Sequence, residues 1–440
     1  MSDLTVTAKL VPPNPRRIAA SLLDGVLGKG RALDDLLADR TIGFRGLTDR
    51  DRAFVRRLVA TALRRRGQVD GVLRKFLTLW PKGLPREALR LGTTELLFLD
   101  APPHAAVDSA VDLMHPEQKK PRGLINAVLR KVAAEGAAIV AQQDAARQNT
   151  PDWLWRSWEQ AYGPDLARDI AQAHLQEAPL DISVKGDAAG WAERLQAELL
   201  PSGCLRRQAA GAVESLPGYD DGTWWIQDAA AALPAKLLGD VNGKTVADLC
   251  AAPGGKTAQL AAMGAQVMAV DRSDPRLKRL KENLKRLHLK AEVRTAEIEH
   301  WQPPHVFDAV LLDAPCSATG TIRRHPDLPY LKDETDVMKL AALQQRLINA
   351  AWAMLKPGGK LVYCVCSLQP EEGERHMPLL RALAGARIVP ADAAMLGVPE
   401  DAVTLDGALR TLPCHWAERG GMDGFFAVCL EKTAAPKAAT

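Results

Sequence analysis

The back half of the chain alternates short apolar runs with longer amphipathic segments, and this pattern constrains the fold more than any other feature. The apolar runs predict strands at Thr245–Cys250, Ala265–Val270, Ala291–Ala296, Phe307–Leu312, Lys360–Cys366 and Phe425–Leu430. The segments between them predict helices at Lys256–Met263, Asp274–His288, Lys339–Leu355 and Glu371–Leu383. Because strands that alternate with helices form a mostly parallel sheet covered on both faces, we expect a Rossmann-like α/β domain.

Reactive side chains follow two of these strands. The run FDAVLLDAPCSATGT (307–321) carries Asp313 at the strand end and Cys316 directly after Pro315. The later strand KLVYCVCS ends on Cys366. Ligands of open α/β sheets bind beyond the carboxyl ends of the strands, so the two cysteines could face one substrate. The alternative is that both are small buried hydrophobic residues, as free cysteines usually are.

The first strand of this half leads directly into a glycine-containing turn. Its residues are Cys250, Ala251, Ala252, Pro253, Gly254, Gly255 and Lys256. Paired glycines permit close backbone approach to a ligand, and the next helix points its N-terminus at the same place. The turn is neither the dinucleotide pattern GxGxxG nor the phosphate-binding pattern GxxxxGK[ST], so neither NAD nor ATP is favoured.

Acidic residues at the following strand ends indicate which cofactor the turn serves. Asp271 ends the second strand, where a carboxylate can accept both hydroxyls of a ribose. Glu297 ends the third strand and could meet an adenine or an amine, and Asp313 ends the fourth. These features fit S-adenosylmethionine. The alternative is a glycine turn that holds no ligand.

The first third of the chain is basic and predicted to be all helical. Residues 1–150 contain 25 Lys+Arg and 16 Asp+Glu, whereas the remaining 290 contain 32 and 37. Helical spacing predicts Arg16–Leu27, Asp49–Leu63 with Thr48 as N-cap, Val69–Leu77, Pro85–Phe98, Ala105–Met114 and Gly123–Glu135. The guanidinium group of arginine can donate two hydrogen bonds to the oxygens of one phosphate, so the excess of positive charge favours a polyanion partner. The alternative is that the arginines are scattered over a solvated surface, which would give the same count.

A connector joins the two parts. A helix is predicted to start at Thr150–Pro151, and its tryptophans are expected to pack rather than to stack on bases. Strand-like pieces LDISVK and TWWIQD follow, and then an Ala-rich helix at Gln227–Leu238. We therefore predict a helical domain over 1–148, a small α+β connector over 149–235 and an α/β catalytic domain over 236–440.

Composition excludes several protein classes. The hydrophobic fraction of 47% and the charged fraction of 25% are those of a globular protein. No apolar run approaches the ~20 residues that span a membrane, and the first residues do not resemble a signal peptide. Seven cysteines without a CxxC pair do not form a disulfide framework. We expect a cytoplasmic protein in a reducing compartment.

Several longer stretches of the sequence resemble two known protein families. REALRLGTTELLFLDAPPHAAVDSAV and RGLINAVLRKV resemble the NusB-type RNA-binding helical bundle. DLCAAPGGKT, DAPCSATGTIRRHPDL, LVYCVCSLQPEEGE and DGFFAV resemble the RNA cytosine-C5 methyltransferase superfamily. Together they resemble its RsmB (Sun/Fmu) branch, which modifies small-subunit ribosomal RNA.

The resemblance implies a class I methyltransferase domain and assigns roles to its residues. S-adenosylmethionine would contact 250–256, Asp271, Glu297 and Asp313; position 297 is usually aspartate in the family. The reaction would be methyl transfer to C5 of a cytosine in 16S ribosomal RNA. Cys366 would add to C6 as nucleophile, Cys316 would assist release, and Asp313 is a candidate partner of N3. The expected partner is small-subunit ribosomal RNA, bound by a monomer without a metal.

Four alternatives stay open from the sequence. The target could be transfer RNA, or the chain could be a non-catalytic NusB-like RNA-binding factor. Pro315–Cys316 also resembles the nucleophile motif of DNA cytosine-C5 enzymes, which would exchange the two cysteine roles. A zinc site of Cys316, Cys364 and Cys366 near His325 would lack the usual ligand spacing.

Overall fold

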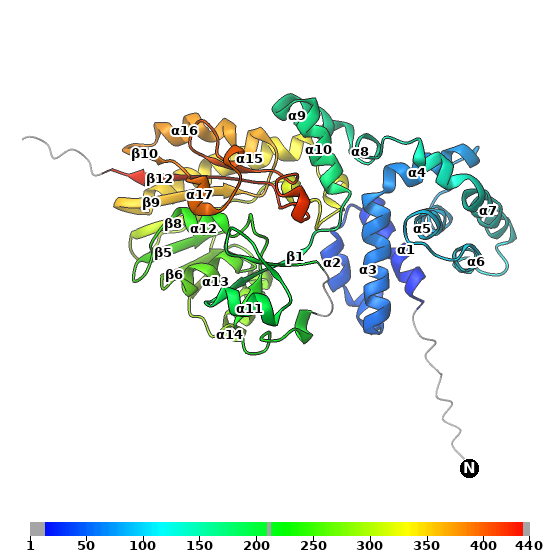
Figure 1. Cartoon of the computed structure of the whole chain (residues 1–440), viewed down its shortest axis with the longest axis horizontal. Coiled ribbons are helices and arrows are strands. Elements are labelled where there is room, and N and C mark those ends of the chain that lie inside the picture. The colour runs from blue at the N-terminus through cyan, green and yellow to red at the C-terminus, as the bar shows by residue number, and fades with distance from the viewer. Residues whose placement is uncertain (1–13, 209–212, 434–440) are drawn as a thin grey trace, which may run out of the picture. The chain divides into compact units, whose positions relative to one another are not determined.

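Figure 1 shows the computed structural model, which describes residues 14–208 and 213–433 of the 440-residue chain. These residues form two compact units. The first comprises the residues up to Trp155 together with His325–Leu331, and the second comprises Arg156–Arg324 and the residues from Lys332 onward. Residues 1–13, on which the expectation of no signal peptide rests, lie outside the described ranges.

The first unit is the predicted helical bundle. Its helices are α1 (Pro15–Leu27), α2 (Leu33–Ala38), α3 (Asp49–Arg64), α4 (Arg66–Phe76), α5 (Leu84–Phe98), α6 (Pro103–Val111), α7 (Lys119–Ala141) and α8 (Ala145–Gln148), with short 3₁₀ turns η1 (Arg40–Ile42) and η2 (Phe44–Gly46). Thr48 caps α3 as predicted, because its side chain accepts from the amide of Asp51 at 3.2 Å. Buried aliphatic residues from α1, α3, α4, α5 and α7 form one core. The short helices α2 and α8 were not predicted.

A segment from the back half of the sequence belongs to this first unit. It contains the 3₁₀ turn η5 (Leu328–Tyr330). The Asp327 carboxylate accepts from the amide of Leu33 at 2.8 Å, and the Tyr330 hydroxyl donates to the carbonyl of Leu63 at 2.9 Å. The Arg66 guanidinium lies 4.6 Å from the centre of the Tyr330 ring. The domain boundaries at 148 and 235 stay a prediction.

A small antiparallel sheet opens the second unit. Its strands run in the order β2-β3-β1-β4 and are β1 (Leu180–Val184), β2 (Glu198–Leu199), β3 (Leu205–Arg207) and β4 (Trp224–Ile226). The other elements of this part of the sequence are α9 (Asp152–Tyr162), which begins in the first unit, α10 (Pro164–His174), α11 (Ala188–Arg194), which packs on β2 and β3, and η3 (Val213–Ser215). Trp158 is buried and its indole N–H donates to Gln369, which agrees with packing.

The predicted helix at Gln227–Leu238 is wrong for its first half, because α12 covers only Leu233–Leu237. The side chains of the preceding residues hold the backbone in another conformation. The Asp228 carboxylate accepts from the amide of Ala230 and is paired with Arg324 at 2.6 Å. The Gln227 side chain bonds Ser183 and Trp225. Buried polar partners therefore override the helical propensity of the alanines.

The large sheet has the predicted mostly parallel architecture. Its order is β10-β12-β9-β8-β5-β6-β7, with β5 (Thr245–Leu249), β6 (Gln266–Asp271), β7 (Glu292–Thr295), β8 (Phe307–Asp313), β9 (Leu355–Val365), β10 (Ala386–Val389), β12 (Phe425–Lys432) and β11 (Leu409–Thr411) beside β12. Strands β7, β6, β5, β8 and β9 are parallel, whereas β12 and its neighbours are antiparallel. Strands β10 and β11 were not predicted.

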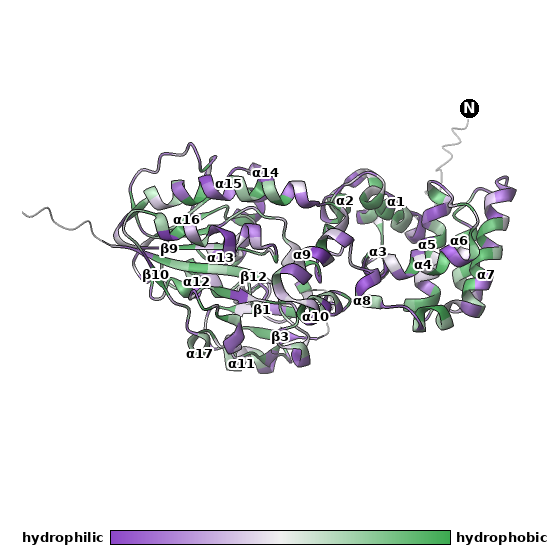
Figure 2. Cartoon of the chain, turned by 90° about the horizontal axis from the view of Figure 1, so that it is seen from above, coloured by the Kyte–Doolittle hydropathy of each residue, from purple (hydrophilic) through white to green (hydrophobic). Residues whose placement is uncertain are grey.

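Helices cover both faces of this sheet. They are α12, α13 (Gly255–Ala262), α14 (Asp274–Arg286), α15 (Glu334–Ala353), α16 (Met377–Ala382) and α17 (Ala393–Leu396). The loops contain the 3₁₀ turns η4 (Thr319–Thr321), η6 (Pro370–Glu372), η7 (Glu374–His376), η8 (Glu400–Ala402) and η9 (Ala417–Arg419). Alternate strand residues pack on opposite faces. Val246 and Leu311 lie with α12 and α13, whereas Ala247 and Val310 lie with α15 and α16. Figure 2 shows hydrophobic colour along the central strands, as expected when both faces are buried.

The predicted helix at Glu371–Leu383 is also wrong for its first half, whereas its second half is α16. Two 3₁₀ turns, η6 and η7, precede the short helix α16. Gly373 separates the two turns with φ −120° and ψ −96°, which is not a helical conformation. Glu372 is fully buried, so its side chain is turned into the protein rather than along a helix surface.

Candidate active site

The two strand-end cysteines lie against each other. In the parallel pair β8–β9, Asp313 is opposite Cys364, so the loops that carry Cys316 and Cys366 leave the sheet side by side. The Cys316 and Cys366 sulfurs are 3.5 Å apart. The amide of Gly320 donates to the carbonyl of Cys366 at 3.0 Å and ties the first loop to the second strand end. The structure thus brings together two thiols that are 50 residues apart in sequence.

An ion pair stands beside the thiols. The Lys256 ammonium lies 2.8 Å from the Asp313 carboxylate and 5.0 Å from the centre of the Phe425 ring. Burial disfavours the charged ammonium, but the attraction of Asp313 outweighs it and raises the pKa of Lys256. This pair joins the glycine turn to the cysteine loop. Lys256 is therefore not a free positive charge at the cofactor turn.

Cys316 keeps its proton in this environment. The hydrogen bond with Cys366 raises the pKa of the Cys316 thiol well above its usual value, and burial raises it further. Cys364 is fully buried in β9, and burial together with Asp313 raises its pKa strongly. A fully buried position in the central sheet is typical of a cysteine that serves packing.

The glycine turn has a fixed shape. Cys250 adopts a positive φ of 60°, and the amide of Ala251 donates to the carbonyl of Val270 at 3.0 Å. Gly254 has φ 105°, and a Cβ there would lie 2.7 Å from the Leu280 side chain. Only glycine satisfies both conditions without a shift of α14. Helix α13 begins directly after this glycine, as predicted.

Asp271 braces the turn and faces the same edge of the sheet. One carboxylate oxygen accepts from the amide of Ala252 at 3.1 Å and the other from the amide of Ser273 at 2.9 Å. A carboxylate has about four acceptor positions, so each oxygen retains one for a hydroxyl group. The side chain is therefore both a structural brace and a group that can bind a diol.

Glu297 lies at the same edge but is exposed. It follows β7, whose last residue, Thr295, is paired with Asp271. Its contact with a cofactor stays a prediction.

Two buried acids in this region, Asp248 and Glu372, were not among the predicted site residues. Asp248 in β5 accepts from the Thr257 hydroxyl at 2.5 Å, and burial raises its pKa to about 7. Its second oxygen has no hydrogen-bond partner among the described residues. Glu372 binds the residues that follow both cysteines. An acid inside the apolar run TVADL was a signal for Asp248, and Glu372 lies inside the motif LVYCVCSLQPEEGE, although that motif did not distinguish it from Glu371.

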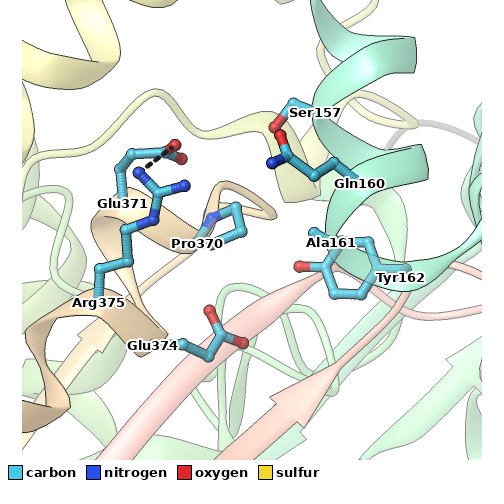
Figure 3. Close-up of a pocket in the computed structure, with 8 residues that line it drawn as sticks. All are labelled: Ser157, Gln160, Ala161, Tyr162, Pro370, Glu371, Glu374 and Arg375. Atoms are coloured by element: carbon cyan, nitrogen blue, oxygen red, sulfur yellow. Dashed lines mark ion pairs between the residues drawn. The ribbon is translucent and has the colours of Figure 1, made fainter.

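A separate cavity of about 300 Å³ lies beyond the loop that follows Cys366 (Figure 3). It is lined by Ser157, Gln160, Ala161, Tyr162, Pro370, Glu371, Glu374 and Arg375. Glu371 and Arg375 form an ion pair at 3.0 Å across one wall. None of the predicted site residues lines this cavity.

Two further findings concern metals and membranes. Within residues 14–208 and 213–433, no group of three or more His, Cys, Asp or Glu side chains could hold a metal ion. Over the same residues, no helix is both long enough and apolar enough to cross a bilayer.

The fold and the site together define a methyltransferase domain with a NusB-type helical bundle before it. The NusB family model matches residues 13–134, and the model described as 16S rRNA methyltransferase RsmB/F matches residues 235–431. Ribosomal RNA small subunit methyltransferase B of Klebsiella pneumoniae subsp. pneumoniae is 37% identical over 389 residues, covering 83% of this chain and 88% of that protein. The protein of the same name from Escherichia coli O127:H6 is 35% identical over 445 residues, covering 95% and 99%. The chain belongs to the RsmB/F family of methyltransferases.

A solved structure shares the fold. The crystal structure of PH0851 matches 96% of this chain and 100% of its own, with a TM-score of 0.73 and 23% identity.

The residues present fit S-adenosylmethionine, on which enzymes of this class depend. The cofactor offers a ribose diol and a cationic methionyl part, and the strand ends offer carboxylates. Asp271 retains acceptor positions for a diol. When bound, the cofactor supplies an electrophilic methyl group.

Proposed function

We propose that this chain methylates C5 of a cytosine in small-subunit ribosomal RNA through a covalent bond between Cys366 and C6 of the base. The observation that carries the proposal is the 3.5 Å contact of the Cys316 and Cys366 sulfurs beside the Asp313–Lys256 pair. The names of the relatives from Klebsiella and Escherichia favour ribosomal over transfer RNA.

The chemistry requires a nucleophile because C5 of cytosine reacts poorly by itself. Addition of the Cys366 thiolate to C6 forms a carbon–sulfur bond and makes C5 electron-rich. C5 then takes the methyl group, a base removes the C5 proton, and the carbon–sulfur bond breaks to return the thiolate. The target base must leave its stack to reach the two thiols.

The two cysteines can act in turn because Cys366 affects the proton of Cys316. The hydrogen bond to Cys366 is the largest cause that raises the pKa of Cys316. Once the Cys366 sulfur is bonded to C6, it no longer holds that proton, and the Cys316 thiol becomes easier to deprotonate. Cys316 then loses its proton to solvent, and the resulting thiolate takes the C5 proton before the carbon–sulfur bond breaks. This order favours Cys366 as nucleophile and Cys316 as the group for release.

Asp313 is the residue that we expect to hold the base. Its side chain is 31% exposed, and one of its oxygens is paired with Lys256. We assign it the hydrogen bond to the N3 edge of the cytosine, with Lys256 fixing its orientation.

Seven free cysteines agree with action in the reducing cytoplasm.

Mapping of 5-methylcytosine at single-nucleotide level tests the proposal. Ribosomal and transfer RNA would be compared from cells with the chain, without it, and with Cys366→Ala. We expect one cytosine of 16S ribosomal RNA to lose its methyl group in both deficient strains. Loss in transfer RNA alone would identify the transfer RNA alternative, and no change in any RNA would contradict cytosine-C5 methylation.

A further inference from the structure

Glu372 is a buried carboxylate that touches neither thiol yet binds the residue after each one. Its first oxygen accepts from the amide of Ser317 at 2.9 Å and from the Gln344 amide group at 3.1 Å. Its second oxygen accepts from the hydroxyl of Ser317 and, at 2.5 Å, from that of Ser367. The two hydroxyls are 3.1 Å apart. Ser317 follows Cys316 and Ser367 follows Cys366, so one carboxylate binds both cysteine loops.

The arrangement uses the full capacity of the carboxylate. Four donors match the roughly four acceptor positions of the group, which compensates for its complete burial. Its backbone is held as well, since the Tyr363 hydroxyl donates to the carbonyl of Glu372 at 2.6 Å. Gln344 also binds the carbonyl of Pro315 at 2.9 Å, directly before Cys316. Tyr363 and Gln344 therefore hold Glu372 in place, and its carboxylate in turn holds the two cysteine loops.

We propose that Glu372 is a positioning residue that sets the distance between the two thiols by binding both cysteine loops. The proposal rests on the proposed function for its catalytic meaning, because a fixed thiol pair matters only if both thiols react. The distance itself can be measured without RNA or cofactor.

Disulfide formation reports that distance directly. Diamide takes two electrons and two protons from a pair of thiols, and their sulfurs must approach from 3.5 Å to about 2.05 Å. We expect the wild-type full-length protein to form a Cys316–Cys366 disulfide, assigned by mass spectrometry of its peptides. Glu372→Ala should slow this reaction by about tenfold or more, because the loops lose their shared anchor.

A conservative variant separates geometry from charge. Glu372→Gln keeps one acceptor for the Ser317 amide, and its amide group can donate to the two hydroxyls, which also accept hydrogen bonds. We expect Gln to restore most of the disulfide rate and of kcat, whereas Ala lowers kcat by about 100-fold with little change in KM.

The adjacent glutamate is a matched control. Glu371 points to the wall of the cavity in Figure 3 and is paired with Arg375 rather than with the cysteine loops. Glu371→Gln should leave disulfide rate and kcat at wild-type values. The melting temperature and cofactor affinity of each variant show whether it folds. If Glu372→Ala does not fold, the disulfide rate of Glu372→Gln is compared with that of the wild type instead.

Three outcomes would overturn the proposal. They are a wild-type protein that forms no Cys316–Cys366 disulfide, a Glu372→Ala variant that forms it at the wild-type rate, and an equal effect of Glu371→Gln. The failure of thiol catalysis would look different: the single cysteine variants would stay active while the disulfide rate still depended on Glu372.

Discussion

At the residue scale, the roles of the two thiols make opposite predictions. Cys366→Ala should lower methylation by about 1,000-fold or more and leave no covalent species, because the nucleophile is gone. Cys316→Ala should still attack C6 and accept the methyl group, but without a group for release it should accumulate a protein–RNA adduct. The adduct would be seen as a band that survives denaturing gel electrophoresis.

A cysteine outside the site provides the control for this experiment. Cys414 is half-buried and lies in the turn that follows β11, so Cys414→Ala should keep full activity. An adduct in Cys366→Ala but not in Cys316→Ala would exchange the two roles. Full activity in both single variants would mean that the two cysteines serve packing and not catalysis.

Also at this scale, Asp271 should carry part of the cofactor affinity. Asp271→Ala removes a charged acceptor worth ~1.5–3 kcal/mol, which corresponds to roughly 10- to 100-fold weaker binding of S-adenosylmethionine. Asp271→Asn keeps one acceptor oxygen, so its affinity for S-adenosylmethionine should lie between those of the wild type and Asp271→Ala. Calorimetry measures both, with Asp221→Ala on an exposed turn as control. Wild-type affinity in Asp271→Ala would refute the ribose contact.

At the element scale, the loop after Cys316 depends on a contact that only glycine allows. A Cβ on Gly320 would lie 1.9 Å from the carbonyl oxygen of Gly424, whose own amide donates to Gly320 at 2.8 Å. Gly320→Ala should therefore displace the loop from the end of β9. We expect a loss of several kcal/mol in the free energy of unfolding and a large fall in kcat, measured by denaturant titration and kinetics.

A glycine in open space gives the matched control. A Cβ on Gly123 in α7 would meet no neighbouring atom within 4 Å, so Gly123→Ala should be neutral or stabilise by about 0.5–1 kcal/mol through helix propensity. If Gly320→Ala behaved in the same way, the loop would not depend on this approach.

At the scale of the whole molecule, the basic helical unit should supply much of the electrostatic affinity for RNA. Several of its arginines serve structure instead: Arg90 is buried with Asp70, and Arg16 is paired with Glu95. Arg45, Arg50 and Arg57 are exposed. These three are the better candidates for phosphate contacts.

Neutralising those residues tests the assignment. The triple variant Arg45→Gln, Arg50→Gln and Arg57→Gln should weaken RNA binding, and the slope of log K against log salt should flatten by roughly two. Arg387→Gln, on the exposed edge strand β10, is the control. An unchanged slope would mean that these arginines do not touch RNA. Removing the whole unit is a less clean test, because His325–Leu331 would lose its partners.

The sequence predicted what depends on local pattern. Strand positions followed from apolar runs, because strands buried on both faces need them, and the carboxyl-end position of Asp271, Asp313 and the two cysteines followed from parallel topology. The Gly254 turn could be predicted because few residues other than glycine tolerate such a backbone. Each of these features depends on residues that are only a few positions apart in the sequence.

Only the tertiary structure decided where buried polar side chains go. Gln227–Leu238 and Glu371–Leu383 have helical composition, yet Asp228 and Glu372 turn inward to partners far along the chain and shorten the helices. Ser317 is 55 residues from Glu372, and Leu33 is 294 residues from Asp327. Local propensity is worth about 1 kcal/mol or less per residue, whereas a buried charge without its hydrogen bonds costs several, so the distant partner decides.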